Sequence, residues 1–140
     1  MKISILLPYK ENFSPQYPGA VSLFINSMNK LSSYKKEITV YGSTDLKEKF
    51  SNSYINIQLK KSFLKSQTRD YVNKFVNLHQ NQDTDVIEIH NRPNYVEFLK
   101  SLDSKKVLYF HNDPISMIGS KSALERKELI RSCTKIIFNS

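Results

Sequence analysis

Short apolar runs alternate along this chain with segments of helical periodicity, and this alternation restricts the possible folds more than any other feature. The runs are continuous, rich in β-branched residues and too short for helices, so each predicts a buried strand. They lie at residues 3–7, 38–41, 86–89, 107–110 and 136–138, with a weaker run at 54–59 after the polar loop 42–53.

Between these runs, apolar residues recur at intervals of three or four, which predicts amphipathic helices. The helical sets are Val21, Phe24, Met28 and Leu31; Tyr71, Val72, Phe75 and Val76; and Tyr95, Phe98, Leu99 and Leu102, followed by a less regular segment at 123–131. Pro93 suits a first helical turn and Ser122 an N-cap. The alternation predicts an α/β fold: a doubly wound, Rossmann-like, mainly parallel sheet with helices on both faces.

The length and composition fit a single globular domain, 1–140. Hydrophobic residues make up 39% of the chain and charged residues 24%, which argues against both a disordered and a membrane protein. Pro8 interrupts the N-terminal apolar run too early for a signal peptide, so we expect a cytoplasmic protein. Cys133 is the only cysteine, which excludes an internal disulfide and predicts a packing role.

The net charge of +8 raises the question of an anionic partner. One segment interleaves basic and apolar residues and could form a surface that binds an anionic membrane at its inner face. Its basic residues are Lys60, Lys61, Lys65, Arg69 and Lys74, and its apolar residues are Phe63, Leu64, Tyr71 and Phe75. The favoured interpretation is a solvated helix face with its apolar side in the core. We expect no nucleic-acid partner, because no DNA- or RNA-binding signature is present.

Ligands of open parallel sheets bind beyond the carboxyl ends of the strands, so the loops there hold the candidate residues. Gly19 ends a polar loop after the first strand and enters a helix, where backbone amides favour phosphate; a plain turn glycine is the alternative. Gly42 and Gly119 are the other glycines, so neither a dinucleotide fingerprint nor a Walker phosphate loop exists.

Two of the three histidines, His90 and His111, follow predicted strands, whereas His79 lies late in a polar helix and is expected to be solvated. A single strand-end histidine is usually structural, but two in equivalent positions favour a site. Only Glu88 or Asp113 lies near enough to add a metal ligand, so we expect no metal.

The order and spacing of these features resemble the N-terminal domain of family-4-like glycosyltransferases, which are retaining enzymes of the GT-B fold. The resemblance rests on Gly19-Ala20-Val21, on residues 85–93 with His90-Asn91-Arg92-Pro93, on residues 107–114 with His111-Asn112-Asp113-Pro114, and on the tail from Glu125 to Ser140. It covers nearly the whole chain.

The resemblance implies two Rossmann-like domains facing each other across a cleft. The N-terminal domain would receive a polysaccharide, lipopolysaccharide or lipid acceptor of the cell envelope, and the C-terminal domain would bind a nucleotide sugar, with no further cofactor. His111 matches the histidine beside the transferred sugar and is the expected catalytic residue, and Gly19 matches a glycine near the donor phosphate. The other expected cleft residues are Ala20, His90, Asn91, Arg92, Asn112 and Asp113.

The family's second domain, which carries most contacts to the donor diphosphate, is absent from these 140 residues. We therefore expect the chain to be inactive alone and to need that domain or a partner chain. The alternative is a non-catalytic, basic α/β module that binds an anionic membrane or polyanion.

Overall fold

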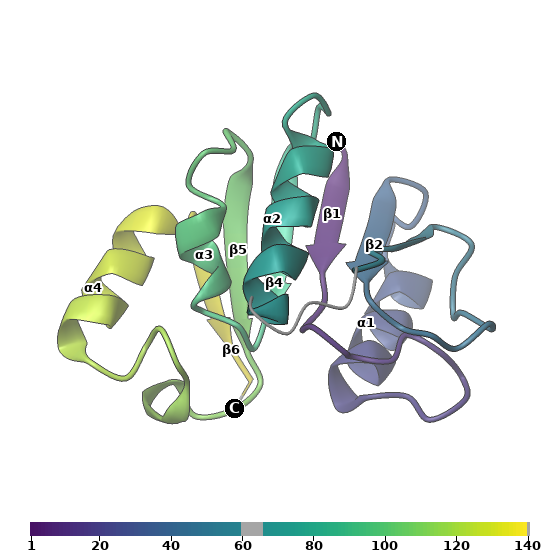
Figure 1. The fold of residues 1–140 in the computed structure, drawn as a ribbon, viewed down its shortest axis with the longest axis horizontal. Coiled ribbons are helices and arrows are strands. Elements are labelled where there is room, and N and C mark those ends of the chain that lie inside the picture. The colour runs from purple at the N-terminus through teal and green to yellow at the C-terminus, as the bar shows by residue number, and fades with distance from the viewer. Residues whose placement is uncertain (60–65, 140) are drawn as a thin grey trace.

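The computed structural model describes residues 1–59 and 66–139, and within them six parallel strands form one sheet in the order β3-β2-β1-β4-β5-β6 (Figure 1). The strands are β1 (Ile3–Leu6), β2 (Ile38–Gly42), β3 (Tyr54–Asn56), β4 (Val86–His90), β5 (Lys105–Phe110) and β6 (Lys135–Phe138). This is the strand order of the doubly wound Rossmann fold, so the predicted fold class is confirmed.

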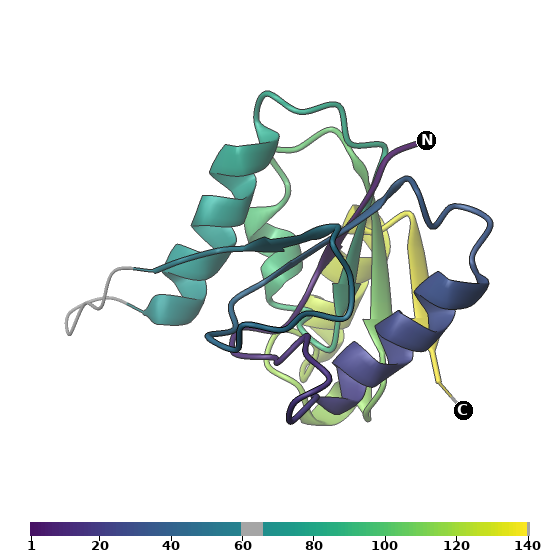
Figure 2. The same ribbon diagram turned by 90° about the vertical axis from the view of Figure 1, so that its right-hand side faces the viewer.

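The helices cover both faces of the sheet. They are α1 (Ala20–Leu31), α2 (Gln67–His79), α3 (Tyr95–Phe98) and α4 (Ala123–Ser132), with a 3-10 turn, η1 (Pro114–Ser116). In Figure 1, α2 lies in front of the sheet and α1 behind it, and Figure 2 shows the two helices on opposite sides. Strand order explains the division, because right-handed crossovers from β1 to β2 and from β3 to β4 run in opposite directions across the sheet.

Two apolar clusters, one on each face, hold the layers together. Ile5 and Leu7 pack with Ile25 of α1, whereas Leu6 and Ile87 pack with Phe75 of α2. Successive strand residues point to opposite faces, so strands buried on both faces must be apolar throughout. Each fully buried aliphatic side chain contributes about 1.5–3 kcal/mol relative to exposure.

The third helix is shorter than predicted. α3 ends at Phe98, whereas the apolar spacing predicts a helix that continues to Leu102. After Phe98, hydrogen bonds join residues three apart instead of four apart. The Leu99 amide donates to the Val96 carbonyl, and the Leu102 amide donates to the Leu99 carbonyl. Because these tight turns still bury Leu99 and Leu102, the apolar pattern is satisfied without a longer helix.

The prediction that His79 is solvated is wrong. Its side chain is 4% exposed, and its ring stacks on Phe75 with 3.9 Å between centroids. His79 Nδ1 lies 2.9 Å from the Phe75 carbonyl and Nε2 lies 2.9 Å from Ser4 Oγ. Four residues after Phe75, His79 shares the buried helix face, and burial lowers its pKa.

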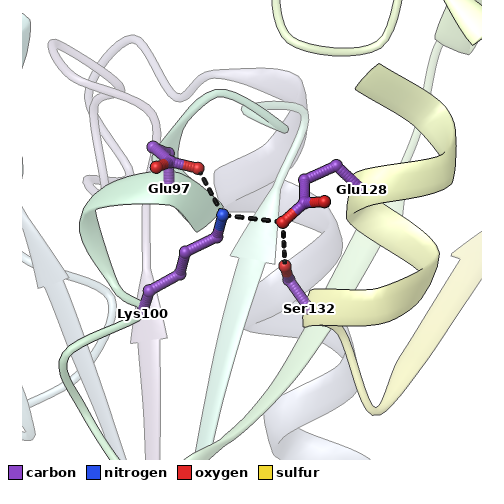
Figure 3. A network of polar contacts seen from close by, with 4 residues as sticks. All are labelled: Glu97, Lys100, Glu128 and Ser132. Atoms are coloured by element: carbon purple, nitrogen blue, oxygen red, sulfur yellow. Dashed lines mark hydrogen bonds and ion pairs between the residues drawn. The ribbon is translucent and has the colours of Figure 1, made fainter. Parts of the chain in front are cut away.

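The last helix begins at the predicted residue, Ala123, and ends one residue later than predicted, at Ser132. Ser122 and Glu125 form a capping box at the start of α4. Cys133 follows the helix and packs against the core, where burial raises the pKa of its thiol to about 11. On the surface, Lys100 bridges Glu97 of α3 and Glu128 of α4 (Figure 3).

The basic segment lies only partly within the described residues. Lys60, Lys61 and Lys65 lie outside them, as do Phe63 and Leu64. Tyr71 and Phe75 are fully buried, so the apolar side of α2 belongs to the core and is not available to a membrane. None of the described helices is both long enough and apolar enough to span a bilayer.

Candidate functional site

The candidate residues gather at the carboxyl edge of the sheet, next to the point between β1 and β4 where the strand order reverses. His90 is the last residue of β4, and His111 directly follows β5. Gly19 is the N-cap of α1, at the end of the loop that leaves β1. In a parallel sheet these positions share one edge, which is where this fold class binds ligands.

The two histidines are in direct contact. His90 Nδ1 lies 2.9 Å from His111 Nε2, and the rings are nearly parallel, at 23° with 5.2 Å between centroids. His90 is 1% exposed and stacks on Tyr109, its Cα partner in the β4–β5 register. Phe24 of α1 meets the His111 ring edge-on at 4.8 Å, so helix and strands together fix its position.

Both outer ends of the histidine pair have polar neighbours. Asn139 Nδ2 lies 2.8 Å from His111 Nδ1, and Glu88 Oε2 lies 3.6 Å from His90 Nε2. Burial and the adjacent His90 ring lower the pKa of His111. The pair therefore forms the centre of a polar chain, Glu88–His90–His111–Asn139, that begins in the sheet and ends at an exposed amide.

Asn91 holds the ends of β4 and β5 together. Its backbone is left-handed, with φ 53°, and its side-chain Oδ1 accepts the His111 backbone N–H at 2.7 Å. Its own amide donates to the Tyr109 carbonyl, and its carbonyl accepts from Arg92 Nη1 at 2.7 Å. Asn91 and Arg92 thus position the histidine pair through backbone groups.

At Gly19, a carboxylate from the same chain occupies the place where a ligand phosphate was expected. Glu11 Oε1 accepts the Ser22 backbone N–H at 3.0 Å, in the first turn of α1. A Cβ on Gly19 would lie 1.8 Å from that oxygen, so the glycine makes room for Glu11. A ligand anion at this helix end would have to displace the Glu11 carboxylate.

The remaining predicted residues lie at the periphery of this edge. Ala20 and Asn112 are exposed. Asp113 is also exposed, and its Oδ1 accepts the Ile115 amide at 3.0 Å as the N-cap of η1. Its visible role is to fix the turn after His111.

A polar pocket of about 660 Å³ opens at the carboxyl ends of β1, β2 and β3. Amide, hydroxyl and charged side chains line it, among them Tyr9, Lys10, Asn12, Asp45, Asn56 and Gln67. The polar loops after the strands are visible in the sequence, but their convergence is not. Nor does the sequence reveal Glu11 and Asn139 as parts of the site, since each acts through a contact that only the fold creates.

Two buried tyrosines hold the strand ends and the loop next to this pocket. Tyr71 donates its hydroxyl to the carbonyls of Leu7, at 3.0 Å, and Tyr41, at 3.3 Å. The Tyr95 hydroxyl accepts the Tyr9 amide at 2.9 Å. Hydrogen bonds with one tyrosine of α2 and one of α3 therefore fix the backbone of the loop after β1.

A second pocket, of about 640 Å³, lies at the opposite edge and is lined by residues 79–85 and 101–105. It is the weaker candidate, because ligands of open parallel sheets bind at the carboxyl edge. Within residues 1–59 and 66–139, no cluster of three or more His, Cys, Asp or Glu side chains could hold a metal ion.

Comparison of the chain with protein-family models, with curated proteins and with solved structures found no match. Function is therefore inferred from the residues at the carboxyl edge of the sheet and from their geometry.

Proposed function

We propose that this chain is the acceptor-side domain of a retaining, two-domain glycosyltransferase. It would receive a glycan or lipid-linked acceptor at the carboxyl edge of its sheet, and a second domain would bind the nucleotide sugar. The proposal is supported by the doubly wound sheet together with the sequence resemblance at His90, Asn91 and His111.

One observation favours an acceptor over a nucleotide at this edge. The carboxylate of Glu11 already caps the N-terminus of α1, the position at which related folds bind a diphosphate. The adjoining pocket is lined by the hydroxyl of Tyr9 and the amides of Asn12 and Asn56, beside one lysine and one aspartate. Hydroxyl and amide groups suit the hydroxyl groups of a sugar. His111 lies at the same edge and can orient a sugar ring through one hydrogen bond.

Binding is tested by titrating the ¹⁵N-labelled chain with neutral methyl glycosides and with UDP, GDP and ADP sugars. We expect the glycosides to shift the amide resonances of Tyr9, Asn12 and His111, while those of Asp83 and Ser104 at the opposite edge stay in place. Nucleotide sugars should bind weakly or not at all. Tight nucleotide-sugar binding, or glycoside shifts confined to the opposite edge, would contradict the assignment.

Transfer itself is tested in a protein that carries both domains. His111→Ala should lower turnover by about 100-fold or more, the usual effect of losing one preorganised contact in the transition state. Circular dichroism of the variant should be unchanged. Near-normal turnover, or loss of activity only through unfolding, would mean that His111 is structural.

A further inference from the structure

The ring nitrogens of the histidine pair carry information about the ligand. Three contacts link the side chains in a row. Glu88 Oε2 lies 3.6 Å from His90 Nε2, His90 Nδ1 lies 2.9 Å from His111 Nε2, and His111 Nδ1 lies 2.8 Å from Asn139 Nδ2. A neutral imidazole has one N–H donor and one bare acceptor nitrogen. The contact between the rings therefore allows only two arrangements of the protons.

In the first arrangement, both rings are protonated at Nε2. His111 donates to His90 Nδ1, the Asn139 amide N–H donates to His111 Nδ1, and the His90 N–H points at Glu88. In the second arrangement, both rings are protonated at Nδ1. His90 then donates to His111, and His111 donates to the oxygen of an Asn139 amide rotated by half a turn.

Glu88 distinguishes the two arrangements. His90 is 1% exposed, and its Nε2 has no hydrogen-bond partner among the described residues. At 3.6 Å the carboxylate is too far for a hydrogen bond but close enough to act electrostatically. It attracts an N–H at Nε2 and repels a lone pair there, so it favours the first arrangement.

We infer that Glu88 and His90 hold His111 in the tautomer whose Nδ1 is a bare acceptor, so that the ligand group facing His111 is a hydroxyl donor and not an anion. Glu88 and His90 are positioning residues, since they act on the ligand through His111. The tautomer stands on geometry alone, whereas identifying the donor as a sugar hydroxyl rests on the proposed function.

The exposed amide of Asn139 marks where that hydroxyl would bind. Asn139 follows β6, and its side-chain N–H supplies His111 Nδ1 with a donor. A ligand O–H that replaced this amide would make an equivalent hydrogen bond. A phosphate oxygen would instead face a lone pair, and the lowered pKa of His111 opposes the protonation that would reverse this preference.

Long-range ¹H–¹⁵N spectra of the histidine side chains test the tautomer directly, with His→Gln variants of each histidine to assign the signals. The spectra are recorded at about pH 8, above the ordinary histidine pKa of ~6.5. His79 is an internal reference, because its Nδ1 faces a backbone carbonyl and must carry the proton. We expect His79 protonated at Nδ1 and both His90 and His111 protonated at Nε2. A proton on His111 Nδ1 would overturn the inference.

Two variants and one control identify which residue sets the tautomer. Glu88→Gln removes the charge, so His90 and His111 should shift together toward the Nδ1 form, while Glu97→Gln, which neutralises an exposed carboxylate on α3, should change neither. Asn139→Ala should leave both rings in the Nε2 form. An unchanged spectrum for Glu88→Gln, or a switched one for Asn139→Ala, would remove Glu88 as the determinant. The His79 signal shows whether each variant remains folded.

The ligand class is tested with methyl α-glucoside and inorganic phosphate at matched ionic strength. The glucoside should shift the His111 Nδ1 resonance, and phosphate should not. A phosphate effect without a glucoside effect would overturn the ligand class. If neither probe acts, the hydroxyl assignment and the proposed function both fail, while the tautomer, measured without ligand, is judged separately.

Discussion

Asn91 sets the separation of the two histidine backbones by adopting a conformation that most residues avoid. Its positive φ turns the chain sharply at the end of β4, so that its side chain can accept the His111 amide. Asparagine enters the left-handed region more readily than other residues with a Cβ, because its short amide makes local hydrogen bonds. Backbone shape and side-chain chemistry are therefore both needed at this position.

Replacing Asn91 separates these two contributions. Asn91→Gly keeps the left-handed backbone and loses only the hydrogen bond, whereas Asn91→Ala loses both. We expect Asn91→Ala to lower the free energy of unfolding by about 2–3 kcal/mol, from about 1–2 for the left-handed backbone and about 1 for the hydrogen bond. Asn91→Gly should cost less. Urea denaturation measures both, and an alanine variant as stable as the glycine variant would show that the backbone is not strained.

At this scale, the sequence predicts where the histidines lie but not what surrounds them. Their position after apolar runs is enough to place His90 and His111 at one edge. Glu11, Glu88 and Asn139 could not be assigned, because their roles depend on distances between segments far apart in the chain. His79 is buried because it lies four residues after Phe75, on the apolar face of α2 that the sequence already predicts, and its polar side chain alone does not decide its exposure.

Among the elements, α2 does more than cover the sheet. Through Tyr71 it reaches the carbonyls of Leu7 and Tyr41, at the ends of the adjacent strands β1 and β2. The exposed bridge from Lys100 to α3 and α4 in Figure 3 is a different kind of contact, since solvent screens ion pairs there. The buried hydroxyl is therefore the stronger determinant of how the elements fit together.

Tyr71→Phe removes this hydroxyl while keeping the ring. The Tyr41 carbonyl keeps the Leu7 N–H as a donor, whereas the Leu7 carbonyl loses the Tyr71 hydroxyl. A buried carbonyl that loses its donor costs about 1–3 kcal/mol, so we expect a loss of that size in the free energy of unfolding. Amide resonances of Leu7 and Tyr9 should shift, because the loop after β1 loses one anchor. Tyr34→Phe, which alters a half-exposed tyrosine, is the matched control and should be neutral. Equal stability of the two variants would contradict the role given to Tyr71.

The sequence predicts elements best where burial is continuous. All five strong apolar runs are strands, because burial on both faces leaves little room for another pattern. The weaker run at 54–59 is a strand only at Tyr54–Asn56, where it pairs with β2 at the edge of the sheet. In α1 the helix itself is predicted correctly but the burial of two of its residues is not. Met28 and Leu31 belong to the apolar pattern, yet both side chains are exposed.

For the whole molecule, the important division is between the two faces of the sheet. The larger apolar cluster joins α2, α3 and α4 to one face, and the smaller joins α1 to the other. His79 links the end of α2 to β1 through Ser4 Oγ, in the interior on the side of the larger cluster. Both ring nitrogens have hydrogen-bond partners, and burial penalises the charged form of the ring. Protonation of His79 is therefore coupled to unfolding.

Stability should therefore fall as the solution is made acidic. The pKa of His79 lies below its ordinary value of 6.5 in the folded chain, because burial penalises the charged ring. The unfolded chain then binds more protons than the folded chain below about pH 6.5, so the free energy of unfolding decreases as the pH falls. Urea denaturation from about pH 7.5 to about pH 5 measures this slope. His79→Gln should make the free energy of unfolding depend less on pH. Adding His111→Gln to it should reduce that dependence further, because the pKa of His111 is lowered too. An unchanged slope in His79→Gln would mean that the ring is protonated without loss of the fold.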